Sequence, residues 1–253
     1  MSQPNAPKSR PAASADPHEH FLVSFDGTPI HYLLWPAAKP NPDRPVVLLV
    51  HGAGEYGERY RSFAQFLTEA GYTTAAIDLR GFGQSGGPRA YVNRFSDYWG
   101  DLDAVAAQIL RITDSKRLHL IGHSMGGLIA ASAAALDRPA HLVSLTLSSP
   151  CFALSYSVPP HLRAIGAVCS KLAPKTLFAT KAISELLTHD KEIAQAHRVD
   201  PKIVHFMSAR LFFEMHAQMK HPDRLARRIH VPTAVFQAGD DRIVNAKVSR
   251  AFF

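Results

Sequence analysis

Two kinds of hydrophobic pattern alternate along the chain up to residue 150. Short continuous apolar runs, typical of buried parallel strands, alternate with longer segments whose apolar residues recur at the helical period. The expected strands cover residues 46–50, 73–78, 118–122 and 142–148. The expected helices cover residues 60–70, 95–112 and 128–136. This alternation predicts an α/β fold with a mostly parallel sheet flanked by helices.

The chain begins with a different kind of sequence. Residues 1–18 are rich in Pro, Ala, Ser and Asn and predict a disordered tail, because they offer too little apolar surface to bury. Residues 20–25 and 29–35 flank Asp26-Gly27, which is a short-turn signature. We therefore expect a two-stranded hairpin at the edge of the sheet, within a core that covers residues 19–150.

The alternation of strands and helices stops after residue 150. Residues 151–228 show helical periods interrupted by prolines, and no strong strand pattern returns until residues 233–236. We expect a helical lid inserted before the last strand, with the core resuming over residues 229–253. The apolar residues of this lid suit a pocket for an apolar ligand, although most of them must simply pack the lid onto the core.

Composition and charge limit the classes of protein that fit. The hydrophobic fraction is 46% and the charged fraction 19%, as in ordinary globular proteins. No apolar run reaches the roughly 18 residues of a membrane span, and the N-terminus lacks the apolar region of a secretory signal, so we expect a cytoplasmic location. Cys151 and Cys169 have no metal-ligand spacing and are expected to be free thiols.

The net charge of +7 lies mostly in the expected lid, where Lys and Arg outnumber Asp and Glu about two to one between residues 161 and 230. A basic lid suits transient contact with a membrane surface or attraction of anionic substrates, and a solvated helical surface is the simpler interpretation. We do not expect nucleic-acid binding, because the basic residues are not clustered with aromatic ones and no binding motif accompanies them.

The strongest candidate for chemistry is Gly122-His123-Ser124-Met125-Gly126. Gly-x-Ser-x-Gly between a strand and a helix is the pattern of a nucleophile elbow, in which the serine hydroxyl is exposed above the amides of the helix. A chance match in a chain of this length has odds of roughly one in ten, so the setting of the motif matters more than the motif alone.

Two further segments follow expected strands at the same end of the sheet. The run His51-Gly52-Ala53-Gly54-Glu55 fits half of an oxyanion hole, and a flexible connection to the next helix is the alternative. We expect His51 to orient this loop rather than to act as a base. Residues 80–87 are also glycine-rich, but they lack a phosphate-binding register, so we expect no nucleotide.

The sequence offers a candidate for the acid member of a catalytic triad but no histidine in the expected place. Asp241 follows the last expected strand and could hold a histidine ring, whereas Asp240 is better suited to loop hydrogen bonds. In this architecture the histidine follows the acid along the chain, but all 14 histidines precede Asp241. We do not expect His123, His205 or His216 to replace it.

The end of the sequence also bears on the missing histidine. The chain stops at Phe253 within an expected helix, without a following strand to cover the edge of the sheet. We therefore expect that a C-terminal strand and helix and the catalytic histidine are missing from this sequence, which puts hydrolysis by this chain in question.

Four motifs at residues 51–55, 80–85, 122–127 and 239–244 resemble those of the α/β-hydrolase fold, and within it those of the monoacylglycerol lipase and lysophospholipase group. The resemblance covers the chain from about residue 20 to its end. It implies a serine hydrolase that cleaves carboxylic esters of single-chain lipids through an acyl-serine intermediate, with a small-molecule lipid ester as its partner and no cofactor or metal.

The resemblance also implies roles for individual residues. Ser124 is the implied nucleophile and Asp241 the implied acid, and the backbone amides of Ala53 and Met125 form the implied oxyanion hole. The family's histidine would lie about 30 residues beyond Asp241. A general carboxylesterase or thioesterase, or a non-catalytic protein that binds a lipid or a partner, remains an alternative.

Overall fold

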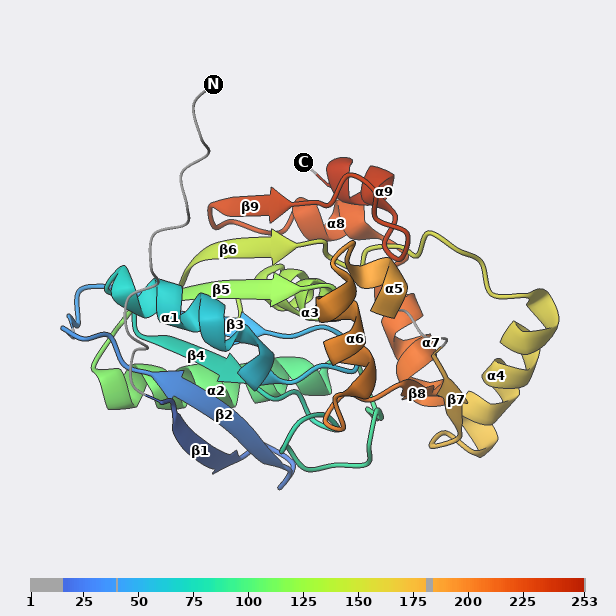
Figure 1. Ribbon diagram of the computed structural model, residues 1–253, viewed down its shortest axis with the longest axis horizontal. Helices are drawn as coiled ribbons and strands as arrows, with labels where there is room; N and C mark the ends of the chain where they lie inside the picture. Colours follow the sequence, from blue (N-terminus) through green and yellow to red (C-terminus); the bar gives the residue numbers. More distant parts are fainter. Residues whose placement is uncertain (1–15, 40, 181–183, 253) are drawn as a thin grey trace.

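The computed structural model describes residues 16–39, 41–180 and 184–252, and a seven-stranded sheet forms its centre (Figure 1). Its strands are β1 (His18–Val23), β2 (Pro29–Trp35), β3 (Val46–Val50), β4 (Thr74–Ile77), β5 (Leu118–His123), β6 (Leu142–Ser148) and β9 (Thr233–Phe236). They lie in the order β1-β2-β4-β3-β5-β6-β9. The strands β1 and β2 pair antiparallel, as do β2 and β4, and the remaining pairs are parallel. The expected edge hairpin and mostly parallel sheet are thus confirmed.

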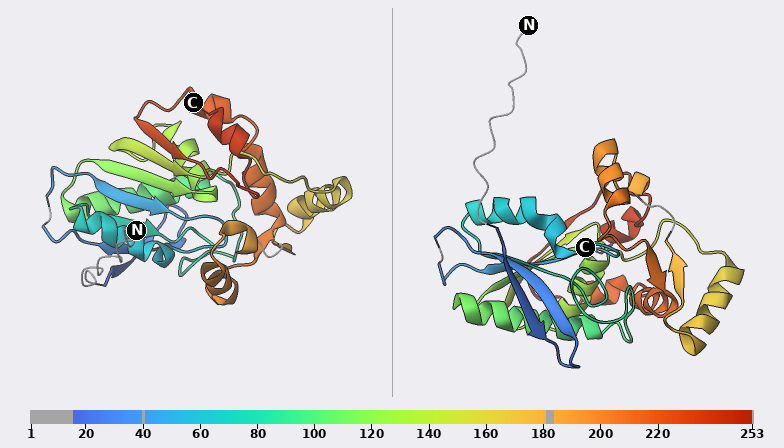
Figure 2. Two further views of the ribbon diagram at one scale, coloured as in Figure 1. Left: turned by 45° about the horizontal axis from the view of Figure 1, so that its top comes forward. Right: turned by 60° about the horizontal axis from the view of Figure 1, so that its bottom comes forward.

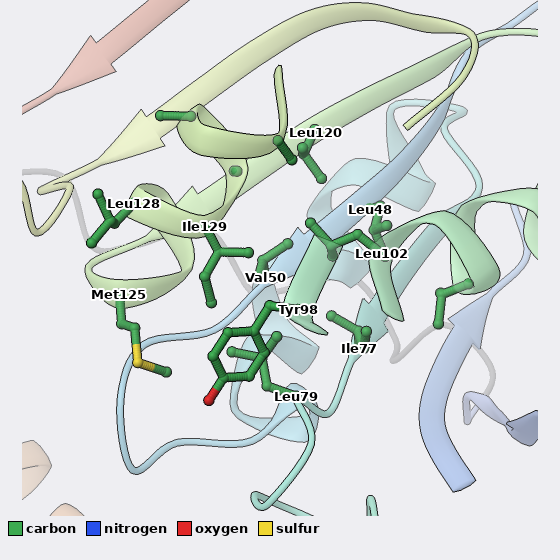
Figure 3. Close-up of a cluster of buried hydrophobic side chains, with 14 of the residues drawn as sticks. Leu48, Val50, Ile77, Leu79, Tyr98, Leu102, Leu120, Met125, Leu128 and Ile129 are labelled. Carbon is green, nitrogen blue, oxygen red and sulfur yellow. The ribbon is translucent and has the colours of Figure 1, made fainter. Parts of the chain in front are cut away.

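Different helices cover the two faces of the sheet, because side chains alternate along each strand. Leu48 faces α2 (Asp97–Thr113) and α3 (Met125–Ala134), where Figure 3 shows it among other buried apolar side chains. Leu49 points to the opposite face, which α1 (Arg61–Glu69) covers together with a short 3-10 helix at Gly57–Tyr60. Burial on both faces explains why β3 is a continuous apolar run.

The first strand begins earlier than its sequence pattern indicates. The expected tail ended at residue 18, but His18 already pairs with Leu34 of β2. The polar His18-Glu19-His20 run carries no apolar signal, and cross-strand pairing to β2 extends the strand over it. The rest of the expected tail, residues 1–15, lies outside the described residues.

The chain between β6 and β9 forms an insertion, residues 151–228, at the carboxyl end of the parallel strands (Figure 1). Its elements are α4 (Pro160–Leu172), β7 (Leu177–Ala179), α5 (Ser184–Leu187), α6 (Lys191–Val199), β8 (Phe206–Ser208), α7 (Ala209–Gln218) and α8 (Pro222–Ala226). In both views of Figure 2, α4 stands farthest from the sheet. After β9, α9 (Ala246–Arg250) closes the described chain.

The insertion is mostly helical, but it also contains two short strands that the sequence pattern did not predict. The strands β7 and β8 pair antiparallel in a separate two-stranded sheet. Each has only three residues, which is too short for a period of two to stand out from the helical periods around it. No helix in the described ranges is both long and apolar enough to cross a membrane.

A buried ion-pair network ties the edge hairpin to α2 and to the loop after β4. The Arg80 guanidinium donates from Nε and Nη2 to the two carboxylate oxygens of Asp101, both at 2.6 Å, and from Nη1 to Asp26 at 2.7 Å. The Ser24 hydroxyl also donates to Asp101, at 2.6 Å. Burial alone would raise the pKa of Asp26, but the hydrogen bonds from Arg80 and Thr28 outweigh it and lower that pKa to about 2.

We predict that Arg80→Met destabilises the fold by about 3–5 kcal/mol, because it leaves the Asp101 carboxylate buried without its charged partner. The Asp101 side chain is 0% exposed. Urea unfolding curves measure the loss. Arg138→Met is the matched control, since Arg138 pairs with the partly exposed Asp103 and its loss should cost about 1 kcal/mol or less. Equal losses for both variants would contradict the prediction.

Candidate active site

Ser124 occupies a strained turn between β5 and α3. Its φ of 51° and ψ of −117° lie in a region that residues with a side chain rarely adopt. Two backbone hydrogen bonds hold the turn: the Ser124 N–H donates to the Ser148 carbonyl, and the Cys151 N–H donates to the Ser124 carbonyl, both at 3.0 Å. The neighbouring segment therefore fixes the turn from outside, as a nucleophile elbow requires.

The glycines of the elbow permit close packing of backbone on backbone. A Cβ atom on Gly126 would lie 2.3 Å from the Val50 carbonyl oxygen, and one on Gly122 would lie 2.4 Å from the Gly126 carbonyl oxygen. The first turn of α3 consequently rests on the end of β3. No described residue accepts a hydrogen bond from the Met125 N–H, so this amide is available to a ligand above Ser124.

The loop after β3 lies directly against the nucleophile. A Cβ atom on Gly52 would lie 3.3 Å from the Ser124 Cβ. Within the described part of the chain, the Ala53 N–H has no acceptor, and Ala53 itself is exposed. The structure therefore brings Ser124, Ala53 and Met125 together at one place.

His51 orients this loop and is not available as a base. Its Nε2 accepts a hydrogen bond from the Leu79 N–H at 3.0 Å, so its Nδ1 carries the proton and donates it to the Gly52 carbonyl at 2.7 Å. Burial lowers the pKa of His51 and outweighs the opposing effect of nearby Asp78. The ring is thus neutral with both nitrogens engaged, which confirms the expected orienting role.

Glu55 is a site residue to which the sequence analysis gave no role. Its carboxylate accepts hydrogen bonds from the Gly52 N–H at 3.0 Å, from the Tyr60 hydroxyl at 3.0 Å and from the Arg59 Nε at 3.3 Å. Burial alone would raise the pKa of Glu55, but His123 and the other neighbouring donors and charges outweigh it and lower that pKa. The only indication of Glu55 in the sequence is its place in the motif at residues 51–55.

Asp241 is held in a fixed orientation in the loop after β9. Its Oδ1 accepts from the Val244 N–H at 2.8 Å and from the Ile243 N–H at 3.0 Å, and its Oδ2 accepts from the Gln237 side-chain amide at 3.1 Å. Asp240 is exposed. The structure therefore orients Asp241 much more firmly than Asp240, and the catalytic role of Asp241 stays a prediction.

Cys151 links the nucleophile to Asp241. Its N–H binds the Ser124 carbonyl, and its buried thiol lies near the Asp241 carboxylate. Burial and this carboxylate raise the pKa of the thiol to about 12, so the sulfur remains protonated and is a poor nucleophile. Cys151 and Cys169 are both free, as expected.

Among the described residues, no histidine ring is hydrogen-bonded to the Ser124 hydroxyl. The His123 Nδ1 is 3.1 Å from the Ser148 carbonyl oxygen, and the His216 Nδ1 is 3.0 Å from the Phe212 carbonyl oxygen. His205 packs edge-on against another histidine of the insertion. That none of the three replaces a catalytic histidine stays a prediction.

A cavity of about 280 Å³ with both polar and apolar lining opens beside the elbow. It is lined by Glu55, Arg59, Tyr60, Ile121, His123 and Ser148. The described residues contain no cluster of three or more His, Cys, Asp or Glu side chains suited to a metal ion. The arrangement of a half-buried serine, two available amides and a cavity with some polar lining suits the binding of an uncharged carbonyl compound with a polar substituent.

A strained serine on a strand-turn-helix unit, at the carboxyl end of a mostly parallel sheet, defines the class of α/β hydrolases. The family model described as Serine aminopeptidase, S33 (Hydrolase_4) matches residues 41–253, so the chain belongs to this family.

Relatives and solved structures agree with that assignment. The chain is 30% identical to the monoacylglycerol lipase of Mycolicibacterium smegmatis over 237 residues, 92% of this chain and 82% of the relative. It is 29% identical to phospholipase YtpA of Bacillus subtilis over 206 residues, 80% of this chain and 79% of the relative. A soluble variant of Saccharomyces cerevisiae monoglyceride lipase, solved with a substrate analog, has the same fold, with a TM-score of 0.82 at 22% identity over 98% of this chain and 85% of its own.

We predict that Gly126→Ala destabilises the protein by at least about 2 kcal/mol, because its Cβ atom would collide with the end of β3. Thermal unfolding measures the effect. Gly239→Ala is the matched control: a Cβ atom there would meet nothing within 4 Å, and the change should stay within about 0.5 kcal/mol. A Gly126→Ala variant as stable as the control would contradict this account of the elbow.

Proposed function

We propose that this chain is built as a serine hydrolase that cleaves carboxylic esters of single-chain lipids, monoacylglycerols or lysophospholipids, through an acyl-serine intermediate. Ser124 is the nucleophile, Asp241 is the acid member of the triad, and the N–H groups of Ala53 and Met125 form the oxyanion hole. The observation that carries the proposal is the strained Ser124 turn, packed against a loop whose Ala53 amide has no acceptor among the described residues.

In the proposed mechanism the Ser124 hydroxyl attacks the ester carbonyl. The oxyanion that forms accepts hydrogen bonds from the Ala53 and Met125 amides, each worth about 3–4 kcal/mol in the transition state. The bond to the alcohol then breaks, the alcohol leaves with a proton, and water hydrolyses the acyl-serine. Proton transfer requires an imidazole oriented by Asp241, and no histidine follows Asp241 in this sequence.

Two observations support a lipid ester with a polar headgroup. The cavity beside the elbow offers the Arg59 guanidinium and the His123 imidazole to hydroxyl groups of a leaving alcohol such as glycerol. The insertion lies over the carboxyl end of the sheet, and we propose that residues 151–228 act as a lid for the acyl chain. The relatives named monoacylglycerol lipase and phospholipase point to the same substrate class.

We predict that a fluorophosphonate probe labels the purified chain at Ser124, and that Ser124→Ala abolishes the labelling. Because the hydroxyl needs a base, labelling should accelerate at least about tenfold when millimolar imidazole supplies one. Mass spectrometry of the labelled peptide identifies the site. Circular dichroism of the wild type and of Ser124→Ala serves as the control for folding.

One outcome of this experiment and one of an ester-hydrolysis assay would contradict the proposal. A folded wild-type chain that no probe labels, with or without imidazole, would favour the non-catalytic alternative. Hydrolysis of acetyl and butyryl esters well above that of long-chain monoacylglycerols would favour a general carboxylesterase or thioesterase.

We also propose transient contact between α4 and a membrane surface. Leu162, Ile165, Val168 and Leu172 recur every three or four residues on this helix and are between 51% and 82% exposed. Such a stripe, at the farthest point from the sheet and close in sequence to the exposed Lys171 and Lys175, suits an anionic lipid surface. The expected cytoplasmic location stays a prediction.

We predict that the double variant Ile165→Asp, Val168→Asp binds vesicles containing phosphatidylglycerol at least about tenfold more weakly than the wild type, because two apolar side chains no longer enter the lipid. Vesicle co-sedimentation measures the binding. Phe66→Asp is the matched control, since Phe66 is equally exposed but lies on α1. Equal binding by all three proteins would contradict the proposed contact.

A further inference from the structure

The insertion touches the oxyanion loop through its own backbone. The Val204 N–H donates a hydrogen bond to the Gly54 carbonyl at 2.9 Å. Gly54 has a φ of +82°, and a Cβ atom there would lie 2.6 Å from the Val204 carbonyl oxygen. Only glycine therefore allows the two segments to approach this closely.

This hydrogen bond continues through the loop toward Ala53. The Gly54 carbonyl shares a peptide unit with the Glu55 N–H, which donates to the Gly52 carbonyl at 3.3 Å. The Gly52 carbonyl in turn shares a peptide unit with the Ala53 N–H. Because C=O and N–H point in opposite directions in a trans peptide, the Val204, Glu55 and Ala53 amides form one chain of aligned donors. Each bond in such a chain orients and polarises the next.

Side chains hold the two segments together. The Tyr56 hydroxyl donates to Asp200 Oδ2 at 2.8 Å, and the Lys202 ammonium binds Glu58 at 2.8 Å. Burial and the Asp200 carboxylate raise the pKa of Tyr56, so its hydroxyl stays a donor. The Lys202 pair is half exposed and contributes little, whereas the bond from Tyr56 to the carboxylate is charge-assisted.

The core fixes only one end of the same chain of peptides. His51 donates to the Gly52 carbonyl, and Glu55 accepts from the Gly52 N–H. In the described ranges, the only backbone hydrogen bond to the Gly54 carbonyl from outside the loop comes from Val204. The carbonyl of the peptide before Ala53 is thus held from the core by His51, and it is also held by the Glu55 N–H, whose own peptide is bound by the insertion.

We propose that Val204 is a positioning residue for catalysis: its backbone N–H, held by the Tyr56–Asp200 contact, aligns the Ala53 amide that receives the oxyanion. This inference rests on the proposed function, because it assigns a task to the oxyanion hole. It makes the placement of the insertion a condition for reactivity at Ser124, without any contact between Val204 and the substrate.

Two variants test the inference. Val204→Pro removes the N–H, and Tyr56→Phe removes only the hydroxyl that holds the segment. Val204→Ala is the control for the first, because it keeps the N–H. Tyr91→Phe is the control for the second, because among the described residues the Tyr91 hydroxyl donates only to Asn93, at 3.5 Å. Circular dichroism checks that all four variants fold.

The first measurement is hydrogen–deuterium exchange of residues 52–57, which needs no activity. We expect exchange about tenfold faster in Val204→Pro and Tyr56→Phe, and unchanged exchange in both controls. The second is fluorophosphonate labelling with imidazole present. We expect the maximal labelling rate to fall at least about tenfold, with the half-saturating probe concentration unchanged, because only the transition state uses the Ala53 amide.

Unchanged exchange in a wild-type-like, labelled protein would overturn the positioning role and leave the proposed function intact. Faster exchange with an unchanged labelling rate, or equal effects in the variants and their controls, would also overturn it. A wild-type chain that is never labelled would instead overturn the proposed function, whatever the exchange shows.

Discussion

The carbonyl oxygen of Val50 lies where a side chain on Gly126 would have to be, and this contact brings the first turn of α3 onto the end of β3. The same approach places Gly52 against Ser124 and so assembles the candidate site from two strand ends. Any larger residue at Gly126 would push the helix away and separate the Met125 and Ala53 amides. The strain at Ser124 is tolerated because the backbone around it is held on both sides.

Buried polar groups hold the two glycine-rich loops in place, as glycine packing holds the elbow. The Asp78 carboxylate accepts the Gly57 N–H at 2.6 Å and the Gln84 N–H at 2.7 Å, so one side chain joins the two glycine-rich loops. A hydrogen bond between the His31 ring and this carboxylate, at 2.8 Å, completes the contact. The insertion then meets this surface through residues 200–204, while α4 packs against α7 and keeps a row of apolar side chains exposed. One inserted segment thus combines a fixed part and an exposed part.

The sequence alone determined most of the fold, because local rules govern it. Strands buried on both faces must be continuously apolar, and β3 is found where such a run predicts it. The elbow followed from the spacing of Gly122 and Gly126 around Ser124, since no other residue fits that turn. The pair β7 and β8 was missed because three residues give no period, and β1 began early because its pairing with β2 overrides a polar sequence.

The sequence also indicated most residues of the candidate site, but only tertiary structure shows how they are held. The Glu55 carboxylate accepts a hydrogen bond from the Gly52 amide because the fold buries the two groups together. The sequence motif does not predict this burial. The Tyr56–Asp200 contact joins residues 144 positions apart, for which no local pattern exists. Hydrophobic periodicity and turn chemistry act between neighbours along the chain and can be inferred from it. Hydrogen bonds across the fold depend on where distant segments meet, and only the folded chain decides that.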